Sequence, residues 1–144
     1  MTRSVKFAHQ NVQSMMVMYC DTMIKGKRIP LIIDMGAAGS IVTYQLLNDL
    51  EIEIDQPSAI VMINVNEKKK QPLVEILDFL ITVGGMTVPI NVVVIDAKSY
   101  SAIMGNDWLS KVQAQLNYKA STLLFTWQSQ EVEIPVEYQM ILHE

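Results

Sequence analysis

The chain has 144 residues, half of them apolar and 18% charged, which is an ordinary composition for a globular domain. A chain of this length buries about two-thirds of the surface that it exposes when unfolded, so we expect one domain with a substantial core. The net charge of -4 and the isoelectric point near 5.1 exclude a general electrostatic attraction to nucleic acid or to anionic membranes.

The cysteine content and the ends of the chain indicate the compartment and the domain limits. Cys20 is the single cysteine, so no internal disulfide can form and a reducing compartment is expected. The apolar run Met15–Tyr19 is too short for the core of a signal peptide or for a membrane span. We therefore predict a soluble, cytoplasmic protein with one domain at residues 12–136, an N-terminal tail at 1–11 and a C-terminal tail at 137–144.

Runs of β-branched residues separated by turn residues predict an all-β sandwich or barrel. Val12–Ile24 and Lys27–Asp34 read as two strands joined by a tight turn. Gly84-Gly85 lies between the apolar runs Leu77–Val83 and Met86–Asp96, which predicts a hairpin because the primed turns need positive φ.

Two short helices are expected to interrupt the strands. Thr43 is placed to cap a helix that runs to about Leu50. Asn106 is placed to cap a second helix from Asp107 to about Gln113, which would bury three apolar residues, Trp108, Leu109 and Val112.

The segment Ile32–Val42, with the sequence IIDMGAAGSIV, carries the most information about chemistry. Asp34 ends an apolar strand and is followed by small residues, which puts a carboxylate on a tight loop with nothing bulky over it. A lone carboxylate in such a place needs hydrogen-bond or charged partners, or it has a functional role. From the spacing alone, the simpler interpretation is that Asp34 accepts hydrogen bonds from the amides of its own turn.

The same segment resembles the D-[ST]-G-[AS] signature of aspartic proteases, with the usual hydroxyl residue further on supplied by Ser40. About seventy residues later, AIMGNDWL at residues 102–109 is similar to the apolar-apolar-Gly element of that family and the helix after it. The form G-x-D-W-L, followed by AQLNY and LLF, is particularly like the proteases of long-terminal-repeat retrotransposons and their domesticated relatives. Over about residues 17–136 the chain thus resembles a retropepsin-like aspartic protease domain. The resemblance implies an all-β acid protease barrel with two short helices that forms half of a homodimeric active site.

The resemblance implies a reaction that needs two carboxylates and no cofactor. One carboxylate activates a water molecule while a neutral carboxylic acid protonates the carbonyl oxygen of the peptide. Two carboxylates about 3 Å apart repel by about 5 kcal/mol at an effective dielectric constant of about 20, so the pair holds one proton over a wide pH range. Asp34 is the one candidate here, since four other aspartates lack its setting: Asp55, Asp78, Asp96 and Asp107. The second Asp34 must come from another copy, so the expected partners are a second copy and a peptide substrate.

The resemblance also implies roles for other residues that occupy matching positions, and some of these residues have a simpler structural interpretation as well. Gly36 would bring its backbone close to the substrate, although it also fits a plain turn glycine. Asp107 would support the catalytic loop near Ser40, although an aspartate at a helix start is favoured by the helix dipole in any case. Ile103 would line a substrate pocket or the core. The other positions implied are Ala37 and Ala38 beside the peptide, Asn64, Val65 and Asn66 in a flap over the substrate, and Met35 and Gly105 in support of the catalytic loop.

Two departures from the family pattern bear on activity. Met35 stands where the family has Thr or Ser, whose hydroxyl hydrogen-bonds across the dimer. A thioether donates no hydrogen bond, so the loss predicts a weaker dimer and a looser pair of carboxylates. The flap-like segment has no glycine, and Asn66 would take a positive-φ position in its place.

Two functions therefore stay open. The first is an aspartic endopeptidase that hydrolyses peptide bonds through a homodimeric Asp34 pair and an activated water, with the processing of a retroelement polyprotein implied by the resemblance. The alternative is a catalytically inactive retropepsin-like module that dimerises or binds peptides, which Met35 favours. A serine hydrolase or a zinc site is not indicated, because the two histidines, His9 and His143, lie in the predicted tails. A phosphate-binding loop is not indicated either, since no lysine precedes Ser40.

Overall fold

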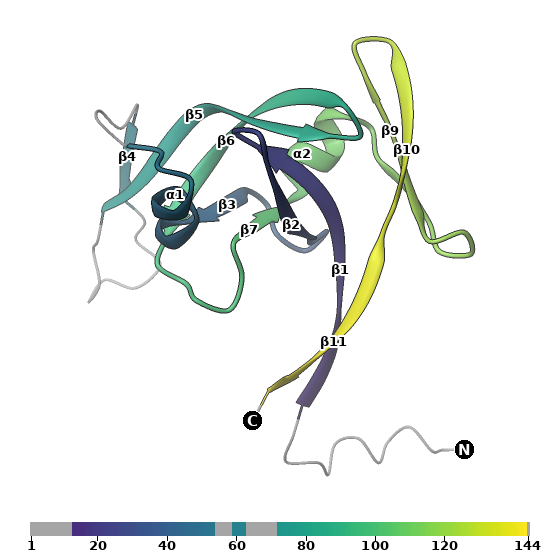
Figure 1. The fold of residues 1–144 in the computed structure, drawn as a ribbon, viewed down its shortest axis with the longest axis horizontal. Helices are drawn as coiled ribbons and strands as arrows, with labels where there is room; N and C mark the ends of the chain where they lie inside the picture. Colours follow the sequence, from purple (N-terminus) through teal and green to yellow (C-terminus); the bar gives the residue numbers. More distant parts are fainter. Residues whose placement is uncertain (1–12, 54–58, 63–71, 144) are drawn as a thin grey trace.

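The main sheet of the computed structural model has eight strands in the order β11-β1-β2-β7-β3-β6-β5-β4 (Figure 1). The strands are β1 (Gln13–Ile24), β2 (Lys27–Ile33), β3 (Ser40–Thr43), β4 (Ala59–Met62), β5 (Pro72–Val83), β6 (Met86–Ile95), β7 (Ala102–Met104) and β11 (Glu137–His143). A pairing of Met23 on β1 with Thr82 on β5 closes six of these strands into a barrel. The structure describes residues 13–53, 59–62 and 72–143. The predicted all-β barrel is confirmed.

Two tight hairpin turns shape the barrel. Lys25 and Gly26 join β1 to β2 with φ values of 53° and 78°, and Gly84 and Gly85 join β5 to β6 with φ values of 56° and 83°. Two successive positive φ values are the geometry of a type I′ turn, whose twist matches that of the flanking strands. The hairpin expected at Gly84-Gly85 and the tight turn between the first two strands are therefore confirmed.

The barrel interior is filled by alternate residues of its strands. On β6, four valine and isoleucine side chains at every second position are buried: Val88, Ile90, Val92 and Val94. Trp108 and Phe125 extend this core, with ring centroids 5.4 Å apart at an interplanar angle of 60°. Such an edge-to-face arrangement stabilises the core beyond the contribution that comes from burying the two rings.

The first short helix forms where it was expected. Helix α1 (Tyr44–Asp49) begins after Thr43, whose Oγ1 accepts a hydrogen bond of 3.1 Å from the Leu46 amide, so the predicted cap is confirmed. At the other end, the Lys25 ammonium donates to the carbonyl oxygens of Leu50 and Glu51, at 3.0 Å each. These bonds satisfy carbonyls at the helix end and tie α1 to the β1–β2 turn.

The second helix is α2 (Asn106–Lys111), followed by a separate three-stranded sheet in the order β10-β9-β8. The strands of this sheet are β8 (Gln115–Asn117), β9 (Thr122–Trp127) and β10 (Gln130–Pro135). Trp108, Leu109 and Val112 are buried, as predicted. The N-cap position is held by Gly105, which makes no side-chain cap hydrogen bond. The prediction that Asn106 caps this helix is therefore wrong.

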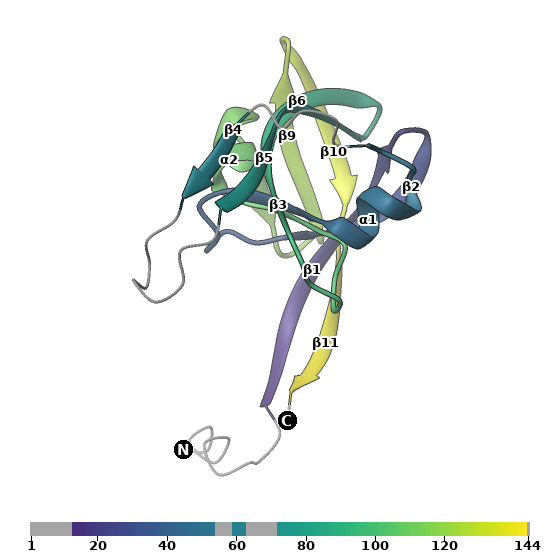
Figure 2. The ribbon, with the colours of Figure 1, turned by 90° about the vertical axis from the view of Figure 1, so that its left-hand side faces the viewer.

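A two-stranded ribbon leaves the barrel and is formed by β1 and β11 (Figure 2). It runs antiparallel, with the register from Gln13 opposite His143 to Tyr19 opposite Glu137. Residues 137–143, expected as a C-terminal tail, form the second strand of this ribbon. The expected N-terminal tail at 1–11 and the flap positions Asn64, Val65 and Asn66 lie outside the described residues.

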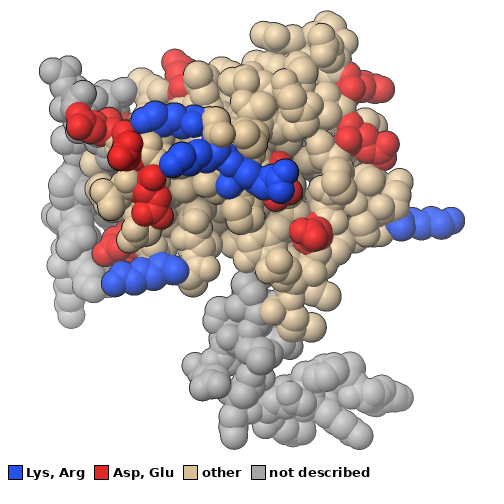
Figure 3. Space-filling view, viewed as in Figure 1, with Lys and Arg blue, Asp and Glu red and all other residues tan. Residues whose placement is uncertain are grey.

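The surface carries both charge signs. Figure 3 shows basic and acidic side chains intermixed on the same face of the molecule, several of them side by side. Each described helix has six residues, and no helix within the described ranges has the length and apolarity needed to cross a membrane.

Candidate active site

Asp34 lies directly after β2, at the point where two parallel strands end side by side. Ile33 on β2 is in register with Met104 on β7, and the Asp34 amide donates to the Met104 carbonyl over 3.0 Å. The Asp34 Oδ1 accepts a hydrogen bond of 2.9 Å from the Gly36 amide, which is the turn contact expected from the spacing alone. The side chain is exposed in the single chain. Backbone bonds thus fix the base of a carboxylate that remains open to a partner or a substrate.

A hydrogen bond between the Ser40 hydroxyl and the Asp107 carboxylate holds the loop that follows Asp34 against α2. Ser40 is 2% exposed, and its Oγ donates to Asp107 Oδ1 over 2.7 Å. Asp107 also accepts from the amides of Ser40, at 3.0 Å, and Trp108, at 2.7 Å. The Ser40 Oγ in turn accepts from the Gly105 amide at 3.1 Å. The structure thus brings together three of the residues expected to support the loop, and Asp107 both bonds Ser40 and lies in the first turn of the helix.

The backbone of Gly105 lies directly beneath the same loop. A Cβ atom at this position would lie 2.6 Å from the carbonyl oxygens of both Ala37 and Gly39, which leaves no space for a side chain. The next two amides of the helix also contact the loop, since Asn106 donates to Ala37 at 2.7 Å and Asp107 to Ala38 at 3.2 Å. The close approach of backbone to backbone explains why glycine stands at 105.

Asn106 binds the loop with its side chain instead of capping α2. Its Nδ2 donates to the Met35 carbonyl oxygen over 2.6 Å. Asp107 supplies the acceptor for the Trp108 amide at the helix start, so an asparagine cap is not needed there. Asn106 therefore holds the backbone of the residue next to Asp34, a role that local helix rules do not reveal.

The remaining expected site residues differ in their exposure. Gly36 and Ala38 are exposed, whereas Ala37 is half-buried. Ile103 is half-buried in the middle of the short strand β7, between the buried side chains of Ala102 and Met104. The loop residues thus face the open side of the molecule, and Ile103 belongs partly to the core.

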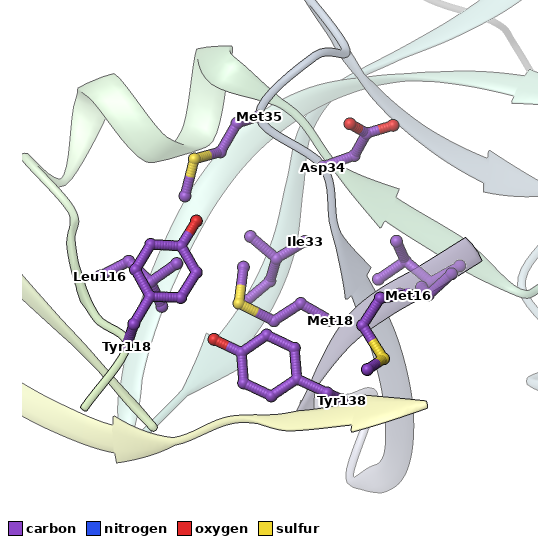
Figure 4. A pocket seen from close by; sticks show the side chains of 10 residues that line it. Met16, Met18, Ile33, Asp34, Met35, Leu116, Tyr118 and Tyr138 are labelled. Atoms are coloured by element: carbon purple, nitrogen blue, oxygen red, sulfur yellow. The ribbon is translucent and has the colours of Figure 1, made fainter. Parts of the chain in front are cut away.

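A pocket of about 390 Å³ opens beside Asp34 (Figure 4). In Figure 4 the Met35 thioether points toward Tyr118 across the pocket, and Asp34 lies at the edge of the group. Asp34 is the single carboxylate among the described residues that line the pocket. We call this the Asp34 pocket; its lining residues are Met16, Val17, Met18, Ile32, Ile33, Asp34, Met35, Leu116, Tyr118 and Tyr138.

Sequence reasoning missed most of the Asp34 pocket, because its walls come from distant segments. Met16 and Met18 lie on β1, and Tyr138 lies on β11 in the expected tail. Alternation along β1 from Met16 to Ile24 is the one sequence signal that could have assigned these methionines to a single face. A smaller pocket of about 240 Å³ shares Met35 and Leu116 with the Asp34 pocket, so these two side chains line both hollows.

Comparison with known proteins gives a consistent result. The family model described as the PEG10/RTL1 protease domain matches residues 30–133. The solved retroviral protease-like domain of Ddi1 from Leishmania major is 17% identical with a TM-score of 0.64, and the match covers 84% of this chain and 90% of that one. A retropepsin-like aspartic protease from Rickettsia conorii is 11% identical with a TM-score of 0.57, covering 90% of this chain and 96% of that one. Among curated protein sequences, none matches this chain.

Proposed function

The chain belongs to the PEG10/RTL1 protease domain family of retrotransposon-derived aspartic proteases, and from that premise we propose that it is an endopeptidase active as a homodimer. Two copies bring their Asp34 carboxylates together about a twofold axis, and the pair shares one proton. The ionised carboxylate takes a proton from water, the water oxygen attacks the peptide carbonyl carbon, and the neutral acid protonates the carbonyl oxygen. The C–N bond then breaks as the amine nitrogen takes a proton from the protonated carboxyl group, while the other carboxylate takes a proton from a hydroxyl of the tetrahedral intermediate, which leaves a carboxylic acid product and a pair that again holds one proton.

The proposal rests on one observation: the Asp34 carboxylate is exposed, the backbone beneath it is fixed by hydrogen bonds, and it is the single carboxylate among the described residues that line the Asp34 pocket. The Gly36 amide fixes one oxygen at 2.9 Å, and the backbone around it is pinned through Met104. No second carboxylate lines the Asp34 pocket within the described part of the chain. A pair that shares a proton therefore requires a second molecule.

The substrate in this proposal is an extended peptide segment of a polyprotein. Gly36 and Ala38 are exposed beside Asp34; the Gly36 amide bonds Asp34 and the Ala38 carbonyl bonds the Asp107 amide, so the Gly36 carbonyl and the Ala38 amide are the groups proposed to bind a strand-like ligand. Recognition of an extended peptide by main-chain hydrogen bonds, with pockets for alternate side chains, suits such an edge. Processing of a retroelement polyprotein is the natural setting for this activity, given the family.

A second candidate is a catalytically silent module that dimerises or binds peptides. Met35 supports it, because its thioether cannot donate the hydrogen bond that a threonine or serine would provide beside the carboxylate. The Met35 backbone is nevertheless held through Asn106 at 2.6 Å, so the loop keeps a fixed shape without that hydroxyl.

Cleavage of a mixed peptide library at mildly acidic pH tests the proposal. The wild type is compared with Asp34→Asn and with Asp49→Asn, a change at an exposed carboxylate on α1 that lines no part of the Asp34 pocket. We expect cleavage by the wild type and by Asp49→Asn, and none by Asp34→Asn. Activity that persists in Asp34→Asn refutes the proposed mechanism, and a wild type that dimerises but cleaves no peptide establishes the silent module instead.

A further inference from the structure

Exposed apolar side chains gather around the Asp34 pocket. Met16 is 61% exposed, Met35 45% and Tyr118 71%, and all three line the pocket. Met140, at 59% exposure, lies directly opposite Met16 in the β1–β11 ribbon and extends the same apolar surface. Large apolar side chains grouped in this way, rather than scattered singly, mark a surface that another molecule covers.

The position of Asp34 selects a second copy of the chain as that molecule. Under the proposed function, two Asp34 side chains meet about a twofold axis, and Asp34 itself lines the pocket. Met35 is the next residue, with its Cα about 3.8 Å along the chain. A copy that brings its Asp34 to this one also brings its Met35 close to the mouth of this pocket, and a twofold axis makes any such contact reciprocal.

We propose that Met35 of each copy packs into the Asp34 pocket of the other copy, so that a pair of exchanged methionines holds the dimer together. This inference rests on the proposed function. Methionine is unbranched and adaptable, and its sulfur makes favourable contacts with aromatic rings such as those of Tyr118 and Tyr138. Loss of the family hydroxyl predicts a weak dimer, whereas an apolar side chain entering an apolar pocket stabilises the dimer by other means.

Sedimentation of the full chain over a range of concentrations tests the proposal with three variants. Met35→Thr introduces the family hydroxyl but removes most of the apolar side chain, and we expect the dimer dissociation constant to rise by about 10- to 30-fold. Met35→Leu keeps the apolar volume, and we expect a change of less than about threefold. Met23→Thr is the matched control, because Met23 is 41% exposed but lies outside the pocket, and no change is expected.

The outcomes separate this inference from the proposed function. A dimer that is unchanged or tighter in Met35→Thr overturns the exchange of methionines, whatever the cleavage assay shows. A higher KM for peptides in Met35→Thr, with an unaltered dimer, assigns the pocket to a substrate side chain and also overturns it. A wild type that stays monomeric overturns it too, while Asp34→Asn still decides the catalytic role by cleavage. A dimer weakened by Met35→Thr but not by Met23→Thr supports the exchange even where no peptide is cut.

Discussion

The bond between Asp107 and Ser40 is the contact whose removal tests most directly how the Asp34 loop is held. The Asp107 carboxylate accepts three hydrogen bonds, from Ser40 Oγ, from the Ser40 amide and from the Trp108 amide. Asp107→Asn keeps the size of the side chain but replaces one acceptor oxygen with an NH₂ group. With its oxygen directed to Ser40 Oγ and Trp108, the amide nitrogen faces the Ser40 N–H, so two donors oppose each other.

The cost of this change follows from the bond that is lost. A hydrogen bond to a charged group is worth about 1.5–3 kcal/mol, and the part-buried Ser40 N–H is left without an acceptor. We therefore expect the free energy of unfolding to fall by about 2 kcal/mol. With a urea m-value of about 1.5 kcal/mol per molar, the unfolding midpoint falls by about 1.3 M.

Urea unfolding, followed by tryptophan fluorescence at one fixed protein concentration, measures this shift. Trp108 is fully buried directly after Asp107 and reports on the region. Asp49→Asn is the control, since Asp49 accepts one exposed hydrogen bond from Gln45 at 2.9 Å and its loss costs at most about 0.5 kcal/mol. If Asp107→Asn lowers stability no more than Asp49→Asn does, the reasoning that this carboxylate clamps the loop is refuted.

Two other predictions concern the core around the site. Gly105→Ala places a Cβ atom 2.6 Å from the carbonyl oxygens of Ala37 and Gly39, so we expect the free energy of unfolding, measured in urea, to fall by about 1–3 kcal/mol. Gly39→Ala is the control and should have a small effect, because its Cβ atom meets its nearest atom at 4.0 Å. Equal effects of the two variants would contradict the close contact at Gly105. Burial, with a smaller effect of Asp21, raises the pKa of the Cys20 thiol from 9.0 to about 12, so labelling by a thiol reagent at pH 8 is slow in the folded protein and fast in urea. The contribution of the neutral Cys20 thiol to the free energy of unfolding is complete below about pH 9 and is lost as the pH rises toward about 12. Rapid labelling of the folded chain at pH 8 would contradict the prediction, because it would show that Cys20 is accessible.

Features set by neighbouring residues could be predicted from the sequence. The Thr43 cap depends on an amide three residues away, and the turn at Gly84-Gly85 depends on the freedom of two adjacent glycines. The end of the strand before Asp34 could also be predicted from neighbouring residues, since an apolar run ends there. These elements form as expected because no distant contact competes with them.

Features set by distant contacts could not be predicted in the same way. Asn106 has the chemistry of a helix cap, but its side chain bonds the Met35 carbonyl, 71 positions away in the chain. Glu137–His143 forms a strand because it pairs with β1, and nothing within the segment indicates that partner. The Asp34 pocket was missed for the same reason, since β1 and β11 supply its walls and only the folded chain brings them to Asp34.

The site divides into a part that one chain completes and a part that it cannot complete. The loop is held within the chain by Ser40, Gly105, Asn106 and Asp107, whereas the Asp34 carboxylate is exposed and, among the described residues, accepts one hydrogen bond, from the Gly36 amide. Under the proposed function, changes to the holding contacts are therefore expected to lower the stability of each copy and the activity together. In the same proposal, changes to Met35 and the other outward apolar side chains leave the single chain stable and alter the association of two copies, whereas a change to Asp34 removes catalysis. Stability in urea and dimer affinity are thus expected to vary independently between these two groups of variants, because different bonds determine them.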